Sequence, residues 1–117
     1  MISVDEIRQY CLSKKGTTEE LPFDEVTLVF KVMGKMFALT SLDEWNAINL
    51  KCTPEEALER RARYESVQPG YHMNKKHWIT APLDGSVPHH EVFAWIDDSY
   101  AIVVSKLPKK TQQQMIE

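Results

Sequence analysis

The chain has 117 residues, of which 43% are hydrophobic, and a formal net charge of −3. This length and composition suit one domain with one core, and no apolar run approaches the ~20 residues that a membrane helix needs. The acidic balance argues against strong non-specific binding to nucleic acid, because neutralisation of phosphates supplies most of that affinity.

The N-terminal residues and the two cysteines indicate a compartment. The chain begins with an acidic stretch and lacks the basic-then-apolar order of a signal peptide. Cys11 and Cys52 stand in no CxxC motif and have no neighbouring set of metal ligands. We therefore expect a cytoplasmic protein in which both cysteines are buried, reduced thiols.

The first half of the chain predicts a helix followed by an antiparallel meander. Ser3 and Glu6 form an S-x-x-E capping box, and Gly16 is a natural end for the helix. An acidic cluster and a loop follow: Glu19, Glu20, Leu21-Pro22-Phe23, Asp24 and Glu25. Apolar alternation and short connections then predict three strands, over residues 26–32, 36–42 and 45–51.

A second helix begins at Thr53, where a threonine cap, Pro54 and Glu56 combine in a second capping box. It runs to about Tyr64. We interpret its most polar side chains as a solvated face: Glu59, Arg60, Arg61 and Arg63.

The second half predicts two strands and a final helical region. A short strand or hook is expected through His72, and a second strand over residues 77–83. Pro88 suits a helix start, with a break near residues 97–99 and an extension over 108–117. Residues 1–117 thus read as one domain of the α+β class. Its antiparallel sheet has helices packed on one side, in the order α-β-β-β-α-β-β-α.

The segment Gly70–Trp78 is the most unusual stretch. Its nine residues carry two histidines, two lysines, two large aromatics and an amide, with no acidic side chain. An ordinary solvated turn mixes both signs of charge, so this composition indicates a binding surface. A second basic cluster follows near the C-terminus: Lys106, Lys109 and Lys110.

Five motifs at these positions resemble the MmcQ/YjbR-type family of small bacterial proteins, over almost the whole chain. They are Lys35-Met36-Phe37-Ala38, Asn49-Leu50-Lys51-Cys52, the segment Gly70–Trp78, Leu83-Asp84-Gly85 and Ser99-Tyr100. The resemblance implies a fold similar to secretion chaperones, frataxin/CyaY-like domains and "double wing" DNA-binding domains. It also implies DNA binding, by analogy of fold.

Our first hypothesis is DNA binding through a basic and aromatic surface on the sheet side. The candidate contact residues are Lys35, Lys51, His72, Asn74, Lys75, Lys76 and His77. Lysines bind phosphates as point charges, and Lys31 extends the surface because its strand parity points it away from the helices. Trp78 and Tyr100 are expected as structural anchors, with Trp78 or Tyr71 as an alternative stacking platform for a base.

Three alternatives remain. A protein-interaction or chaperone-like module fits the acidic balance and an exposed sheet. Metal binding has weak support, since His72 and His77 are five residues apart and only the acidic cluster offers oxygen ligands. Enzyme signatures such as G-x-S-x-G, the P-loop and H-E-x-x-H are lacking. We expect no catalytic activity, no metal or other cofactor, and a monomer or weak homodimer.

Overall fold

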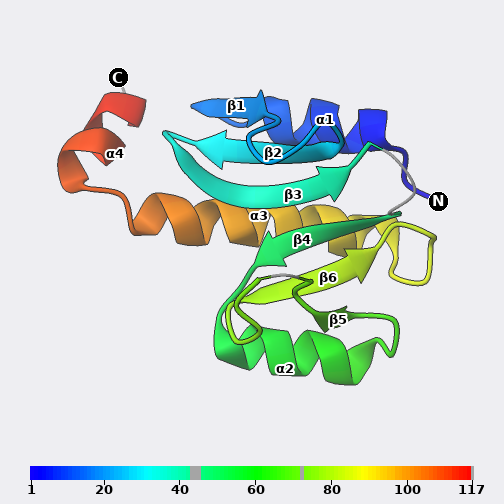
Figure 1. Ribbon diagram of the computed structural model, residues 1–117. Helices are drawn as coiled ribbons and strands as arrows, with labels where there is room; N and C mark the ends of the chain where they lie inside the picture. The colour runs from blue at the N-terminus through cyan, green and yellow to red at the C-terminus, as the bar shows by residue number, and fades with distance from the viewer. Residues whose placement is uncertain (43–45, 72, 117) are drawn as a thin grey trace.

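The computed structural model describes residues 1–42, 46–71 and 73–116, and it shows an α+β fold (Figure 1). The elements in chain order are α1 (Val4–Leu12), β1 (Thr17–Glu20), β2 (Thr27–Val32), β3 (Lys35–Ser41), β4 (Ala47–Lys51), α2 (Pro54–Arg63), β5 (Gln68–Pro69), β6 (Trp78–Pro82), α3 (His89–Ser105) and α4 (Lys109–Ile116). The predicted strand over 45–51 is seen as Ala47–Lys51; Asn46 precedes it outside the strand, and Trp45 lies outside the described residues.

The strands form one six-stranded sheet in the order β1-β2-β3-β4-β6-β5, and every neighbouring pair is antiparallel. The helices lie on one side of it, with α3 running behind the sheet in Figure 1. This confirms the predicted fold class and helix placement. Among the helices of the described ranges, none has the length and apolar composition that crossing a bilayer requires.

The two predicted capping boxes are present. The Ser3 hydroxyl accepts from the Glu6 backbone N–H at 3.1 Å, and the Thr53 hydroxyl accepts from the Glu56 N–H at 3.1 Å. Each cap satisfies a helix-terminal N–H that has no partner within its helix. Local sequence therefore determines where α1 and α2 begin.

The main core fills the space between the sheet and the helices. Leu28, Phe30 and Val32 face this core, as the alternation of β2 predicted. A smaller cluster forms on the opposite, helix-free face, where Val29, Leu39 and Trp78 are buried against Met36 and Met73. The sheet is therefore apolar on both faces near its centre.

Strand β1 was not predicted from the sequence, where Glu19 and Glu20 were assigned to an acidic cluster. The strand pairs with β2 at the sheet edge, and both acids have partners. Arg8 Nε donates to Glu19 Oε2 at 2.8 Å, and Lys31 Nζ lies 3.5 Å from Glu20. The Arg8 hydrogen bond lowers the pKa of the Glu19 carboxyl. Ion pairs with distant residues thus stabilise a strand that has little β propensity.

Two expectations about the helices were wrong. α3 is continuous through residues 97–99, and its two aspartates there have partners on other helices. Asp97 accepts from the Tyr10 hydroxyl at 2.7 Å, and Asp98 accepts from Arg60 Nη2 at 2.8 Å. Arg60 is itself buried and packs over the Trp95 ring, so it does not belong to a solvated face.

The C-terminal residues also differ from the expected extension. Residues 109–116 form helix α4, and Met115 packs against the core. The Gln112 side chain joins α4 to the turn that follows α3, because its Nε2 donates to the Leu107 carbonyl at 2.8 Å. The two lysines of the C-terminal cluster that lie in α4 are exposed: Lys109 and Lys110.

Candidate functional site

The ladder between β3 and β4 is short. It pairs Ala38–Thr40 with Ile48–Leu50 and ends before Phe37, the residue at which β3 bulges in its pairing with β2. At this end of the ladder, the Ser99 hydroxyl donates to the Phe37 carbonyl oxygen at 2.5 Å and accepts from the Lys51 N–H at 2.9 Å. The six strands remain one sheet, and α3 runs behind the place where the β3–β4 ladder ends (Figure 1).

Two hollows lie along strands β3 and β4 and meet at Met73, which lines both. The apolar hollow has a volume of about 430 Å³ and is lined by Phe23, Asp24, Thr27, Leu39, Ser41, Asn49, Tyr71 and Met73. The lysine hollow has a volume of about 330 Å³ and is lined by Lys35, Met36, Lys51, Met73, Trp78, Val103, Lys106 and Leu107. These two neighbouring hollows are the candidate site, and together they are called the groove below.

Three ammonium groups from separate elements surround the lysine hollow. Lys35 starts β3, Lys51 ends β4, and Lys106 follows the last residue of α3. Trp78 is buried between them, and Lys51 Nζ lies 6.0 Å from the centroid of its ring, at the outer limit of a cation–π contact. The hollow lies beyond the last pair of the β3–β4 ladder, where the residue after α3 contributes its lysine.

These three lysines make no ion pair within the described part of the chain. Five other basic side chains are paired with carboxylates: Arg8, Lys14, Lys31, Arg60 and Arg63. Lys31 points away from the helices, as predicted. Its ion pair with Glu20 ties it to the edge of the sheet. The lysine hollow is thus a place where positive charge gathers without a matching negative charge.

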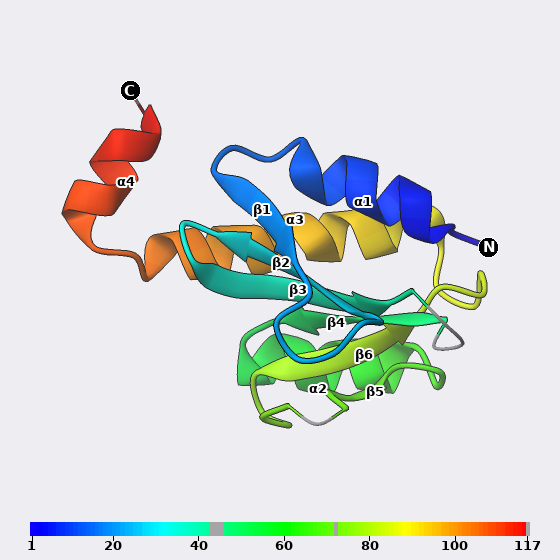
Figure 2. The same cartoon turned by 45° about the horizontal axis from the view of Figure 1, so that its top comes forward.

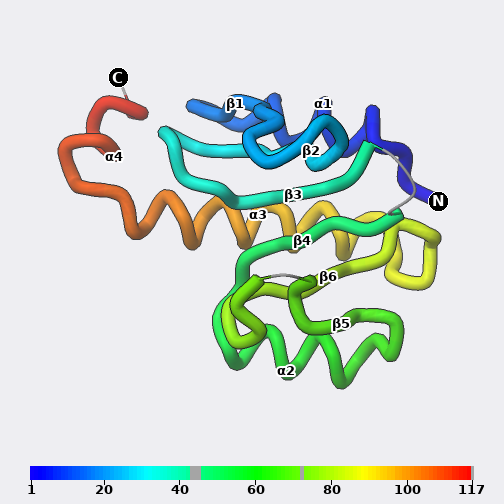
Figure 3. The backbone as a smooth tube through the Cα atoms, viewed as in Figure 1, coloured from blue at the N-terminus to red at the C-terminus, as the bar shows by residue number. Residues whose placement is uncertain are grey.

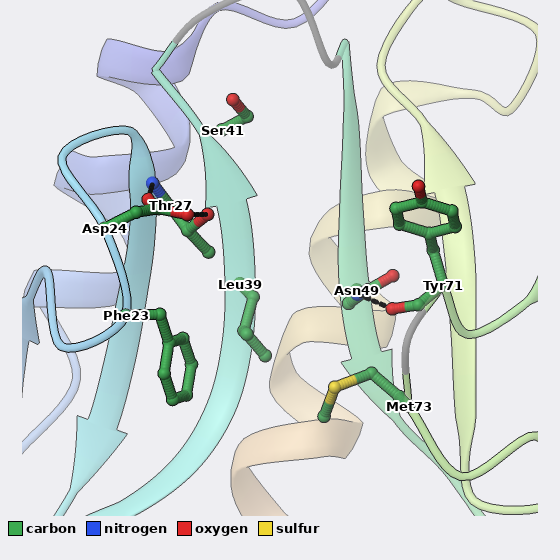
Figure 4. A pocket seen from close by; sticks show the side chains of 8 residues that line it. All are labelled: Phe23, Asp24, Thr27, Leu39, Ser41, Asn49, Tyr71 and Met73. Carbon is green, nitrogen blue, oxygen red and sulfur yellow. Dashed lines mark hydrogen bonds between the residues drawn. The ribbon is translucent and has the colours of Figure 1, made fainter.

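The apolar hollow has aromatic walls from two loops. Figure 4 shows Phe23 on the loop before β2 and Tyr71 on the loop before β6, with Leu39 and Asn49 between them. Both rings are largely exposed, at 65% for Phe23 and 59% for Tyr71. In Figure 2 the first of these loops, in blue, passes in front of the sheet. The hollow is thus bordered by ring faces that solvent reaches.

Asp24 places one negative charge in the apolar hollow. Its carboxylate accepts from the backbone N–H groups of Thr27 at 2.6 Å and Val26 at 2.9 Å, and from the Thr27 hydroxyl. These hydrogen bonds, led by the one from the Thr27 backbone, lower the pKa of Asp24. The carboxylate is therefore ionised at neutral pH, and it holds the loop that carries Phe23.

A buried amide holds the loop of Tyr71. Asn49, which is 3% exposed, donates from Nδ2 to the Tyr71 carbonyl at 3.1 Å (Figure 4). The Tyr71 N–H donates to the Thr80 hydroxyl at 2.9 Å, and that hydroxyl donates to Asn49 Oδ1 at 2.5 Å. Beside this clamp, Gly70 packs so tightly that an added Cβ would lie 2.6 Å from Trp78 Cβ. The loop that carries Tyr71 is therefore held through its backbone, by hydrogen bonds from Asn49 and Thr80 and by close packing at Gly70.

The structure divides the predicted segment Gly70–Trp78. Trp78 is buried, while Asn74, Lys75 and Lys76 are exposed. The Asn74 side chain accepts from the Lys76 N–H at 2.9 Å, so this amide closes the turn. His77 is half-buried and lines a further hollow of about 280 Å³ that it shares with Lys51 and Lys106. His72 lies outside the described residues.

Tyr100 lies on the helix side of the sheet, away from the groove. Its ring packs edge-to-face on Phe37 with centroids 5.4 Å apart, and its hydroxyl donates to the Lys15 carbonyl. It therefore joins α3 to β3 and to the turn after α1.

Sequence reasoning missed Phe23 and Met73 as lining residues, and it left Lys106 outside the candidate surface. The sequence offered two signals: Phe23 is an aromatic residue in a loop, and Lys106 belongs to a basic cluster after the last long helix. Neither signal shows which strands these residues will lie against in the folded chain. As for metals, the described residues hold no group of three or more His, Cys, Asp and Glu side chains arranged to bind an ion.

These features define a class: a small α+β domain with one six-stranded antiparallel sheet covered by helices on one side. The chain belongs to the YjbR family, whose model matches residues 12–102. The resemblance seen in the sequence is thereby confirmed. The backbone trace in Figure 3 follows the matched region from the end of α1 into the second half of α3.

Relatives span nearly the whole chain. The Escherichia coli K12 protein YjbR is 32% identical over 99% of both chains. YbdF of Escherichia coli O157:H7 is 39% identical over 82% of this chain and 85% of its own. The crystal structure of Deinococcus radiodurans protein DR2400 has a TM-score of 0.92 and 38% identity, covering 98% of this chain and 88% of that one. Their names state no activity, so the similarity defines family and fold.

Proposed function

We propose that this protein is a non-enzymatic DNA-binding protein that holds phosphates in the lysine hollow. The observation that carries the proposal is the convergence of Lys35, Lys51 and Lys106, none of which has a carboxylate partner within the described residues. Lys51 is half-buried, whereas Lys35 and Lys106 are exposed. Among the described residues, the other buried or half-buried lysines and arginines all have carboxylate partners. Three unneutralised ammonium groups around one hollow match the charge of a phosphate backbone.

The net charge of −3 does not oppose a local interaction of this kind. Binding depends on the potential at the groove, and an acidic protein can present a positive face. Lys75 and Lys76 are exposed on the loop that carries Met73, so they extend the positive surface beyond the hollow. We expect binding of modest affinity with a strong dependence on salt, since few phosphates are contacted.

A protein-interaction module is the second candidate, and the apolar hollow favours it. Its lining residues Phe23 and Tyr71 are large and exposed. Val26, three residues after Phe23, is also exposed, as is Leu42, whose N–H donates to the Val26 carbonyl at 2.7 Å. Exposed apolar patches of this kind mark partner sites in many proteins. Binding of an apolar partner would change little with salt, whereas DNA binding would weaken steeply.

A pair of charge-matched double variants tests the proposal. Lys51→Gln with Lys106→Gln removes two cations from the hollow. Lys15→Gln with Arg61→Gln removes two exposed cations from other parts of the molecule. Fluorescence anisotropy with labelled duplex and single-stranded DNA at low salt measures Kd. We expect the first pair to weaken binding at least tenfold and the second to have a much smaller effect. Equal effects, or no binding by the unmodified chain, would overturn the proposal.

A further inference from the structure

We propose that the apolar hollow receives one unstacked base of a single-stranded nucleic acid, with its neighbouring phosphates in the lysine hollow. This inference rests on the proposed function and adds to it a preference for single strands over duplex. It follows from the shape of the groove, the distribution of charge along it and the way its walls are held.

The walls of the apolar hollow suit a flat aromatic ligand. Phe23 and Tyr71 rise on opposite sides, and the apolar side chains of Leu39 and Met73 complete the lining (Figure 4). Single-strand-binding proteins stack bases on exposed aromatic side chains of this kind. The volume of about 430 Å³ falls within the ~300–1,000 Å³ typical of small-ligand sites. In a duplex the bases are paired and stacked, so they would reach the hollow only after being flipped out.

Charge sets the direction in which a nucleotide would lie. The apolar hollow contains the ionised Asp24 carboxylate and no lysine, arginine or histidine among its described lining residues. The lysine hollow contains three cations and no carboxylate among its own. A phosphate is repelled from the first and attracted to the second. Since Met73 lines both hollows, a base in one and a phosphate in the other belong to adjacent parts of one strand.

The Tyr71 wall is organised before any ligand arrives. Asn49 and Thr80 bond both backbone polar groups of Tyr71, so the ring is carried on a fixed main chain. A preorganised wall loses less conformational entropy on binding than a mobile loop would. Thr80 and Asn49 are paired in the register of neighbouring strands β4 and β6, which fixes the clamp to the sheet.

Alanine variants of the two aromatic walls test the inference. We expect Tyr71→Ala and Phe23→Ala each to raise the Kd for a single-stranded oligonucleotide about 5- to 150-fold, the range for loss of one stacked base. The Kd for a duplex of the same sequence should change less than twofold. Tyr71→Phe keeps the ring and should bind nearly as the unmodified chain does. Leu58→Ala is the matched control, because Leu58 on α2 is 66% exposed and Phe23 is 65% exposed.

NMR gives a second readout with the full chain. A base in the apolar hollow should shift the methyl signals of Leu39 and Met73 through its ring current, and a duplex should leave them in place. If Tyr71→Ala alters the fold, Phe23→Ala decides the result, since the Phe23 side chain is largely exposed.

The outcomes separate this inference from the proposed function. If the lysine double variant weakens binding but both alanine variants leave the single-strand Kd unchanged, the base site is wrong and DNA binding stands. If the lysine double variant also leaves binding unchanged, both the base site and the proposed DNA-binding function are wrong. If an apolar peptide, and no oligonucleotide, shifts the Leu39 and Met73 signals, the apolar hollow is a peptide site and the inference is wrong.

Discussion

The side-chain hydroxyl of Ser99 donates a hydrogen bond to the carbonyl oxygen of Phe37 at 2.5 Å, so a residue of α3 completes the hydrogen bonding of a bulge in β3. The same hydroxyl accepts from the Lys51 N–H at 2.9 Å. A helix side chain thus replaces the next rung of the β3–β4 ladder. The two strands can separate there without leaving either backbone group unsatisfied, and the lysine hollow lies where they diverge.

Ser99→Ala should destabilise the fold. The Phe37 carbonyl and the Lys51 N–H would both lose their partner, at a cost of about 2–4 kcal/mol for the two groups. Urea unfolding followed by circular dichroism measures the change in free energy. Ser105→Ala, which removes an exposed hydroxyl from the same helix, should cost less than about 1 kcal/mol. Equal effects of the two variants would show that the Ser99 contacts are unimportant.

The parts of the fold that depend on neighbouring residues were predictable from sequence. The capping residues determine the starts of α1 and α2, and the alternation of β2 determines which of its side chains face the helices. Strand β1 was not predictable in this way, because its acidic residues form a strand only when Arg8 and Lys31 lie beside them. α3 likewise passes unbroken through Asp98, whose partner Arg60 lies thirty-eight residues earlier in the chain.

Gly70→Ala should destabilise the chain through a steric clash. The added Cβ would lie 2.6 Å from Trp78 Cβ, and neither backbone can move away freely because the Gly70 N–H donates to the Trp78 carbonyl at 2.9 Å. We expect a loss of about 1–3 kcal/mol, as for other overpacked sites. Thermal or urea unfolding measures it. Gln68→Ala, on the exposed part of β5, should change stability by less than about 0.5 kcal/mol. A Gly70→Ala chain as stable as this control would contradict the steric argument.

The candidate site was only partly predictable. The composition of Gly70–Trp78 indicated a binding segment, and the structure places Trp78 in the wall of the groove with Lys75 and Lys76 exposed beside it. The sequence could not show that Lys106 would meet Lys35 and Lys51. That meeting depends on the strand register and on where α3 ends, and both follow from the tertiary packing of the whole sheet.

Stability should fall in acid partly because of Asp24. Its pKa is lower in the folded chain than in the unfolded chain, owing chiefly to the Thr27 backbone hydrogen bond. The stabilisation is therefore complete above the unfolded value near ~4 and is lost as pH falls through the lower, folded pKa. Asp24→Asn should flatten the dependence of the urea midpoint on pH in this range. A dependence of the midpoint on pH that is unchanged in Asp24→Asn would contradict this origin.

Both cysteines should be unreactive in the folded chain. Burial raises the pKa of the Cys11 thiol to about 12 and that of Cys52 to about 11, so very little thiolate is present near neutral pH. A chromogenic disulfide reagent should titrate two thiols in denaturant and react only slowly with the native chain. Single Cys11→Ala and Cys52→Ala variants assign each reaction. Rapid release of one equivalent from the native chain would contradict the burial of that thiol.

Lys35 and Lys31 should differ in their contribution to DNA binding, although they lie four residues apart. Lys35 lines the lysine hollow without an ion pair, whereas Lys31 is paired with Glu20 at 3.5 Å. Each lysine that neutralises a phosphate adds about 0.9 to the slope of log K against log salt on duplex DNA, and about 0.7 on a single strand. Lys35→Gln should reduce the slope by about that amount, because it removes a phosphate contact. Lys31→Gln removes the same charge and should change the slope much less. The measurement is a salt titration of anisotropy for each variant, and a larger loss of slope in Lys31→Gln would move the binding surface from the groove to the β1 edge.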